Sequence, residues 1–182
     1  GDSTLFLCDT TSTHGTSSCP RIGLRSWKHV GLPTETSRTD HSVALADHSN
    51  DKDGWGTITG IYRATDLAAS AEKIMLHFDD VHESKDLVID NVSIKHLNWD
   101  CSELIVNGDT EYDDTAPRFW RHFSSNSGEK IEVVNLGGSN VLFNHGRKSS
   151  VDGMHQYVDE TCLSEGTKWM AQLKIKVVDE RG

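Results

Sequence analysis

Short apolar runs, mostly alternating with polar residues, recur along the whole chain and are separated by polar or glycine-containing links. Runs of this kind predict β-strands. Between them, residues 65–72 form one short Ala-rich stretch with helical character. Because many strands occur without alternating helices, the pattern predicts an all-β fold, an antiparallel two-sheet β-sandwich or barrel, with residues 1–182 as a single module. The expected strands are 4–8, 21–27, 42–46, 57–63, 73–78, 87–97, 104–107, 130–135, 140–144, 155–159 and 168–178.

The last of these strands has the clearest alternation. Trp169, Leu173 and Ile175 fall on one face, and Gln172 and Lys174 fall on the other. We therefore expect the first face in the core, with Trp169 as a core residue, and the second face toward water or a ligand.

An acidic residue lies inside the apolar strand 87–97. Strict alternation places Val88, Asp90, Val92 and Ile94 on one face, so Asp90 shares a side with apolar neighbours. A carboxylate there needs a cation or several hydrogen bonds. If strand 104–107 pairs with this strand, Glu111 comes near Asp90, and oxygen ligands at neighbouring strand ends suit calcium. The alternative is that backbone N–H groups cap Asp90 without a metal.

The composition limits the partners. The chain has 182 residues and a formal net charge of −10, which argues against nucleic acid as a partner. No apolar run approaches the ~20 residues of a membrane helix, so we expect no membrane partner. No signal peptide is visible, so any export signal has been removed or lies outside this sequence.

The four cysteines favour disulfides. Cys8 and Cys19 flank a polar loop, and a bridge between them would stabilise the fold by about 3 kcal/mol. Cys101 and Cys162 would then form the second bridge. This pattern favours an oxidising compartment, and free thiols in a cytosolic protein are the alternative.

Several motifs resemble a known family, the jelly-roll carbohydrate-binding modules attached to xylanases, laminarinases and cellulases, which have a galactose-binding-domain-like fold. The closing third of such a module resembles Gly-Trp-Gly-Thr-Ile-Thr-Gly at 54–60, Lys-Ile-Met-Leu-His-Phe at 73–78 and Val-Ile-Asp-Asn-Val-Ser-Ile at 88–94. Its opening resembles Leu-Ile-Val-Asn-Gly-Asp-Thr-Glu at 104–111, followed by Trp120. Its middle is similar, more loosely, to Arg147, Gln156 and the stretch 166–169.

The order of these motifs departs from the family, because the closing motif precedes the opening one. Residues 101–182 match the N-terminal half of the family and residues 1–100 the C-terminal half. A circular permutation explains this order, and so does a fragment that joins halves of adjacent repeats. We expect one compact, permuted sandwich, since the joined ends would form a strand, a polar turn and a strand. Strand exchange between neighbouring chains is the competing outcome.

The resemblance implies a secreted, extracellular or cell-wall module that binds a polysaccharide such as β-glucan or xylan on a concave sheet. It also implies a structural calcium ion, with Asp90 and Glu111 as the matching ligands. Sugar recognition uses aromatic rings and planar polar groups. The candidate binding residues are Trp27, Trp120, Arg147, Gln156, Tyr157 and Gln172, although each Trp taken alone also fits a core position.

We expect no catalytic activity, because the chain carries no G-x-S-x-G, H-E-x-x-H or P-loop motif. The alternative function is a structural repeat of an extracellular coat or adhesin, without sugar binding and with self-association. The sequon Asn91-Val92-Ser93 lies inside an expected strand, so we expect it to carry no glycan.

Overall fold

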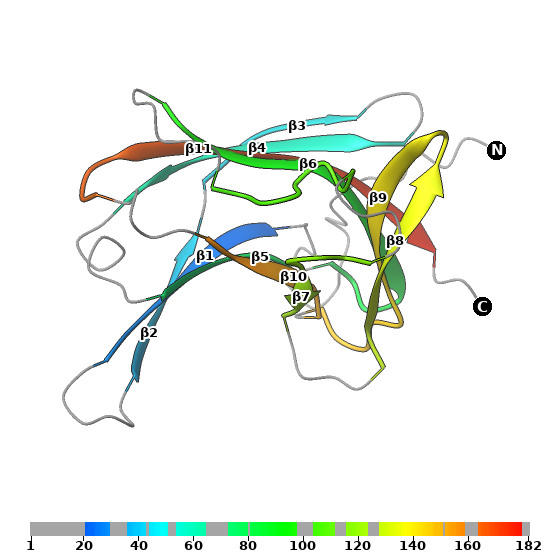
Figure 1. Ribbon diagram of the computed structural model, residues 1–182, viewed down its shortest axis with the longest axis horizontal. Coiled ribbons are helices and arrows are strands. Elements are labelled where there is room, and N and C mark those ends of the chain that lie inside the picture. Colours follow the sequence, from blue (N-terminus) through cyan, green and yellow to red (C-terminus); the bar gives the residue numbers. More distant parts are fainter. Residues whose placement is uncertain are drawn as a thin grey trace, which may run out of the picture.

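The computed structural model is a two-layered, antiparallel β-sandwich (Figure 1). It describes residues 21–29, 36–42, 44–50, 54–64, 73–79, 81–97, 104–111, 116–123, 128–150, 152–158 and 164–179. Within these ranges, the side chains of residues 21, 27–50 and 79 are left undescribed. The described residues contain strands, turns and bends and no helix, which confirms the predicted all-β sandwich. They therefore include no helix that could cross a membrane.

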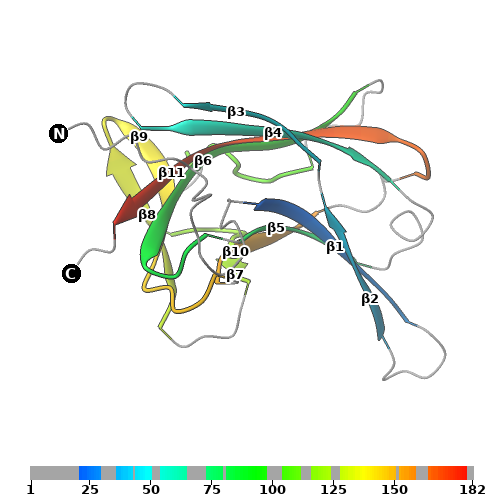
Figure 2. The same cartoon turned by 180° about the vertical axis from the view of Figure 1, so that it is seen from behind.

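The lower layer in Figure 1 is a five-stranded sheet, and the upper layer is a six-stranded sheet. Figure 2 shows the same two layers from behind, and the β8–β9 hairpin follows β6 at one edge of the six-stranded sheet. The five-stranded sheet has the order β2 (Thr36–Ser42), β1 (Arg21–His29), β5 (Lys73–Asp79), β10 (Met154–Val158), β7 (Arg121–His122). The six-stranded sheet has the order β3 (Ala44–Asn50), β4 (Gly56–Arg63), β11 (Lys168–Asp179), β6 (Lys85–His96), β9 (Ser139–His145), β8 (Lys130–Leu136).

Most of the expected strands occur within a residue or two of their predicted bounds. The prediction missed β2 and β7, and its strand 42–46 straddles the end of β2 and the start of β3. The strand expected at 104–107 is wrong, because that segment consists of bends and turns. The expected strand 4–8 and the stretch 65–72 lie outside the described residues.

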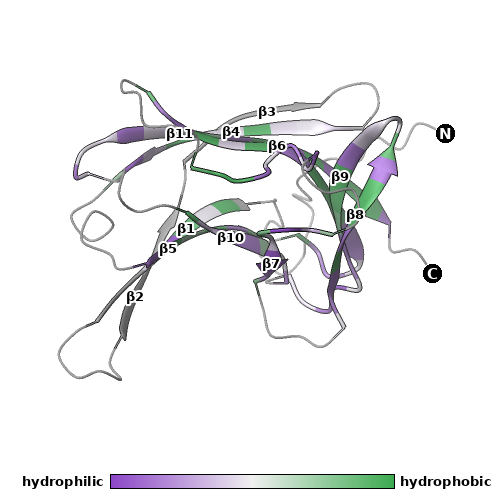
Figure 3. Ribbon diagram, in the orientation of Figure 1, coloured by the Kyte–Doolittle hydropathy of each residue, from purple (hydrophilic) through white to green (hydrophobic). Residues whose placement is uncertain are grey.

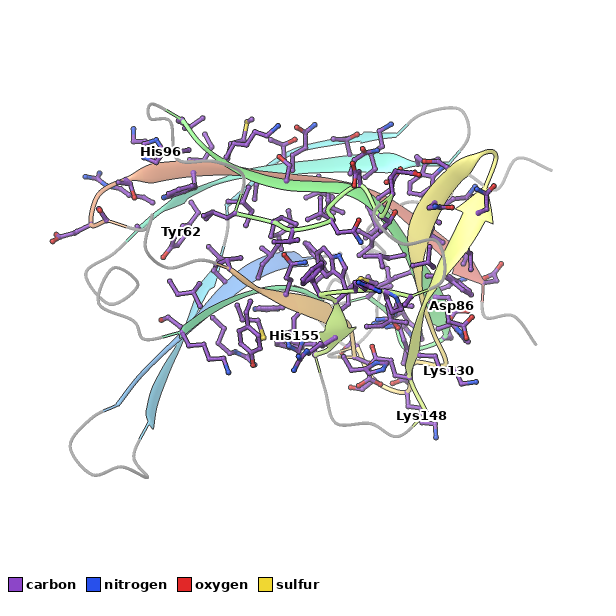
Figure 4. All side chains as sticks on the ribbon, viewed as in Figure 1. Tyr62, Asp86, His96, Lys130, Lys148 and His155 are labelled. Atoms are coloured by element: carbon purple, nitrogen blue, oxygen red, sulfur yellow. The ribbon has the colours of Figure 1, made fainter. Side chains whose placement is uncertain are left out.

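The core lies between the two layers. The inward face of β11 contributes Trp169, Leu173 and Ile175, each at most 1% exposed, as its alternation predicted. The opposite layer contributes residues of β1, β5 and β10, and Tyr62 of β4 points between the layers (Figure 4). A second, smaller apolar cluster forms around Val88, Val141 and Phe143. Figure 3 shows hydrophobic stretches on both layers.

The predicted face of Asp90 is wrong, because β6 contains a β-bulge. Asp90 pairs with Lys174 and Ser93 pairs with Gln172, so two residues of β6 have no partner in the β11 register. Asn91 has φ of 51°, the left-handed conformation that Asn tolerates better than most residues. The extra residue reverses the alternation, so Val92 joins the core while Asp90 lies on the outer face, opposite Lys174.

Segment 104–111 runs beside the second half of β6, although it is not a regular strand. Val92 N–H donates to the Gly108 carbonyl at 2.8 Å, and Leu104 N–H donates to Ile94 O at 3.1 Å. On its other side, the Gln156 amide donates to Val106 O at 2.8 Å and accepts from Val106 N–H at 2.7 Å. A side chain thus supplies the hydrogen bonds that a neighbouring strand would give.

The close approach of Gly108 to the bulge gives a stability prediction. A Cβ at position 108 would lie 1.8 Å from the Val92 carbonyl oxygen, so the segment must move away from β6. We expect Gly108→Ala to lower the free energy of unfolding by about 2–4 kcal/mol, measured by urea denaturation.

Gly137→Ala is the matched control. Gly137 has φ of 65°, but nothing lies within 4 Å of its added Cβ. The substitution should cost only the left-handed backbone strain, about 1 kcal/mol. Equal losses in the two variants would show that the Gly108 contact does not limit stability.

Candidate functional site

The outer face of the five-stranded sheet carries a set of aromatic and basic side chains. In β1, β5 and β10 the inward positions are core residues such as Leu24, Leu76 and Met154, so the alternate positions face outward. The registers place Gly23, His77, His155 and Arg121 in one row, and Arg25, Met75 and Tyr157 in the next. We call this surface the aromatic–basic face, and Figure 4 labels His155 on it. Its described side chains are Arg25, Lys73, Met75, His77, Arg121, Phe123, His155 and Tyr157, of which Met75, His77 and His155 are buried beneath the others.

A stack of side chains stands at the centre of this face. The ring of His77 is parallel to that of Phe123, with centroids 4.3 Å apart. Gly23 leaves room for this imidazole, since a Cβ at Gly23 would lie 2.4 Å from ring atoms of His77. The guanidinium carbon of Arg25 lies 4.5 Å from the Phe123 ring centre, within cation–π distance.

Tyr157 is the exposed aromatic ring of the face. Tyr157 is 40% exposed, and the Lys73 ammonium lies 3.9 Å from the centre of its ring. The His155 ring meets Tyr157 edge-on, with centroids 5.4 Å apart. An exposed phenol beside basic groups can contact an apolar ligand surface and hydrogen-bond polar groups at the same time.

His155 lies at the base of the face and is 8% exposed. Burial lowers the pKa of His155 to about 4, and the positive charges of Arg121 and Lys73 act in the same direction. The imidazole is therefore neutral near pH 7, and its buried Nδ1 has no hydrogen-bond partner in the described part of the structure. His155 therefore adds no positive charge to the face at neutral pH.

The structure separates the six candidate binding residues. Tyr157 lies on the aromatic–basic face, and Trp27 occupies β1 opposite Lys73, with its side chain outside the described part. Trp120 is 4% exposed, packs against Phe78 and donates its indole N–H to Asn107 O at 3.3 Å. Trp120 therefore belongs to the core and does not reach this face.

Arg147 and Gln156 are also buried, at 3% exposure each. Gln156 is held by the backbone of Val106, as described above. Arg147 donates from Nε to Asp152 O, from Nη1 to Lys85 O and from Nη2 to Val81 O, each at 2.8 Å. It thus ties the link between β5 and β6 to the loop before β10.

Gln172 lies on the other sheet, in a hollow of about 450 Å³ at the bulge between β6 and β11. We call it the β6–β11 hollow. Its lining includes no aromatic residue among those described, so these side chains offer amides and charges without a ring surface. Its lining residues are Asn91, Val92, Ser93, Lys95, Ile105, Asn107, Gly108, Asp109, Gln172, Leu173 and Lys174.

The two expected calcium ligands lie near one another, beside the β6–β11 hollow. Burial raises the pKa of Asp90, and the negative charges of Glu111 and Asp109 raise it further, while the Asn91 N–H and Lys174 oppose the rise. Asp90 accepts from Asn91 N–H at 2.7 Å, and Glu111 accepts from Asn140 N–H at 3.0 Å. Among the described residues, no three His, Cys, Asp or Glu side chains are close enough to hold a metal ion.

Other expected features have simpler outcomes. The four cysteines, Cys8, Cys19, Cys101 and Cys162, lie outside the described residues. Asn91 of the sequon is exposed at the bulge, and its amide donates to Asp90 at 2.9 Å.

Sequence reasoning missed most of the aromatic–basic face. The pattern that could have indicated this face is the alternation in 73–78, where Lys73, Met75 and His77 alternate with core residues. Phe123 left no such signal, because it follows a strand of two residues. Comparison of the chain with protein-family models, curated proteins and solved structures finds no match.

A buried acid lies between β7, β8 and β9. The Glu129 side chain is 0% exposed; its Oε1 accepts from Asn144 Nδ2 at 2.7 Å, and its Oε2 lies 3.4 Å from His122 Nδ1. Burial raises the pKa of Glu129 to about 7, and the negative charge of Asp152 adds to the rise. Because the side chain of Glu129 has no exposed surface, we assign it a structural role and not a ligand-binding one.

Glu129 gives a prediction about stability and pH. Its pKa is higher in the folded state (about 7) than the ordinary value of 4.5, so folding binds a proton between these values and stability falls as pH rises from 4.5 to 7. Glu129→Gln keeps a neutral acceptor for Asn144. Relative to the wild type, the variant should therefore gain stability steadily between pH 4.5 and 7.5, measured by urea unfolding.

The difference curve between the two proteins removes the contributions of other groups, such as His155, whose stabilisation is lost as pH falls from 6.5 toward 4. Glu132→Gln is the control, since the Glu132 side chain is 51% exposed. A flat difference curve for Glu129→Gln would contradict the buried, protonated acid.

Proposed function

We propose that the protein is a non-catalytic, secreted polysaccharide-binding module that uses the aromatic–basic face. The observation that carries this proposal is the exposed Tyr157 ring, set among His155, Lys73 and the Phe123 stack. Sugars present apolar C–H surfaces and hydroxyl groups, which match rings and neighbouring N–H donors. We propose a non-catalytic role because the sequence carries no G-x-S-x-G, H-E-x-x-H or P-loop motif.

The family resemblance and the permuted order are part of the same proposal. Both halves of the chain contribute to both sheets: β11 pairs with β4 and β6, and β10 pairs with β5. Such interleaving supports one jelly-roll-like sandwich built from residues 101–182 and 1–100 together.

We also propose a structural calcium ion near Asp90 and Glu111. Support comes from the mutual influence of Asp90, Asp109 and Glu111, whose negative charges lie close enough to raise the pKa of Asp90. Calcium takes six to eight oxygen ligands, and backbone carbonyls commonly supply several of them. The carboxylates of Asp90 and Glu111 could therefore supply part of the ligand set, and backbone carbonyls of the irregular segment 104–111 could supply the rest, without a third acidic side chain.

A glycan panel tests the binding proposal. We expect the chain to bind at least one soluble polysaccharide, and Tyr157→Ala to weaken that binding roughly tenfold because it removes the exposed ring. Affinity gel electrophoresis measures both. Leu136→Ala, which truncates an exposed apolar residue of β8, is the control and should bind as the wild type does.

Silence across the whole panel would overturn the proposal. Self-association detected by light scattering in that case would favour the alternative, a structural repeat of an extracellular coat.

A melting experiment tests calcium. We expect added calcium to raise the melting midpoint above that in chelator, since a hundredfold excess over Kd stabilises the folded state by about 2.7 kcal/mol. Asp90→Asn should remove most of this shift, whereas Asp179→Asn, at an exposed ion pair with Lys85, should leave it unchanged. An unchanged wild-type midpoint would remove calcium from the account.

A further inference from the structure

We propose that the polysaccharide bound by the aromatic–basic face is anionic, a polymer that carries uronate carboxylates or sulfate esters. This inference rests on the proposed function and names the substrate class of the same face. It departs from the neutral β-glucan or xylan that the sequence resemblance implies.

The first argument is charge segregation. The chain has a formal net charge of −10, yet the described charged side chains of this face are Arg25, Lys73 and Arg121. Lys73 and Arg121 are both close enough to His155 to lower its pKa, so both contribute positive potential at β10. A basic surface on an acidic protein is the arrangement that attracts and orients a polyanion.

The strand register limits how far neighbouring acids can cancel this charge. Asp40 of β2 pairs with Arg25, and Asp79 of β5 pairs with Arg21. Each acidic position thus lies opposite an arginine. Among the described side chains, Lys73 and Arg121 remain as the positive charges of the face that no acidic position opposes in the register.

The second argument is the position of the cations over the rings. The Lys73 ammonium lies 3.9 Å from the centre of Tyr157, and the Arg25 guanidinium lies 4.5 Å from that of Phe123. A neutral sugar would have to displace a cation before it could stack on such a ring. An anionic sugar instead gains a charge-assisted hydrogen bond from Lys73 while it contacts the Tyr157 ring.

The third argument concerns length. Arg121 and Lys73 are separated by two strand spacings across the sheet and by four residues along it, since Arg121 pairs with His155 and His155 with His77. Standard strand dimensions put their Cα atoms roughly 16 Å apart. An extended polymer with repeated charges matches two cations that stand this far apart along the face.

Matched polymer pairs test the inference with the full chain. Dextran sulfate is compared with dextran, and polygalacturonate with its methyl ester, by isothermal titration calorimetry at constant calcium. We expect at least one charged polymer to bind at least tenfold more tightly than its neutral partner. We also expect that advantage to fall about tenfold between about 0.05 M and about 0.5 M NaCl. The pair that shows the larger ratio distinguishes sulfate from carboxylate recognition.

The double variant Lys73→Glu with Arg121→Glu should lose at least tenfold in affinity for the charged polymer. The double variant Lys130→Glu with Lys168→Glu, which makes the same charge change at exposed positions of β8 and β11, should lose less than twofold. Matching melting midpoints establish that each double variant is folded.

Four results would overturn the inference. Equal affinity for charged and neutral partners, or equal losses in the two double variants, removes the anionic class and leaves polysaccharide binding standing. Binding of a single-stranded oligonucleotide as tight as that of any glycan replaces the polysaccharide with nucleic acid. Absence of binding to every polymer, including neutral xylan and laminarin, overturns the proposed function as well.

Discussion

The β-bulge at Asn91 is the constraint on which the six-stranded sheet depends. The core residues of β6 change parity between Ile89 and Val92, whereas β11 keeps one inward alternation, so both ends of β6 bury their apolar side chains against the core only if the bulge absorbs one extra residue. The bulge turns Asp90 outward next to Lys174 and turns Val92 inward. The N–H of Val92 then binds Gly108, so the bulge also fixes segment 104–111 and the β6–β11 hollow.

The five-stranded sheet follows a simpler rule, and the candidate site results from it. Its strands have one alternation, so Ile74, Leu76 and Phe78 bury their side chains while Lys73, Met75 and His77 face outward. Since stability comes from the inner face, the outer face is free to hold a polar and charged assembly. Gly23 contributes by its lack of a side chain, which leaves space for His77 beneath Phe123.

Alternation predicts a feature well when the feature is local and regular, which is why the fold class and the β11 core face were predicted and confirmed. β2 was missed because Thr36–Ser42 is polar throughout and carries no hydrophobic period. Asp90 was placed on the wrong face because a bulge breaks the period of two. Arg147 and Gln156 resembled ligand-binding residues by type, but tertiary contacts join both to backbone groups far away in the sequence.

The charge asymmetry of the molecule links these structural facts to the type of partner. On the proposal above, the negative net charge of the chain repels a polyanion while the aromatic–basic face attracts it, so the charge distribution orients the two partners before they touch. His155 is neutral near pH 7, so it adds no positive charge, and Arg25, Lys73 and Arg121 supply the attraction. Capture of a polyanion by this face should therefore depend strongly on salt, whereas recognition of a neutral sugar by rings alone would depend little on it.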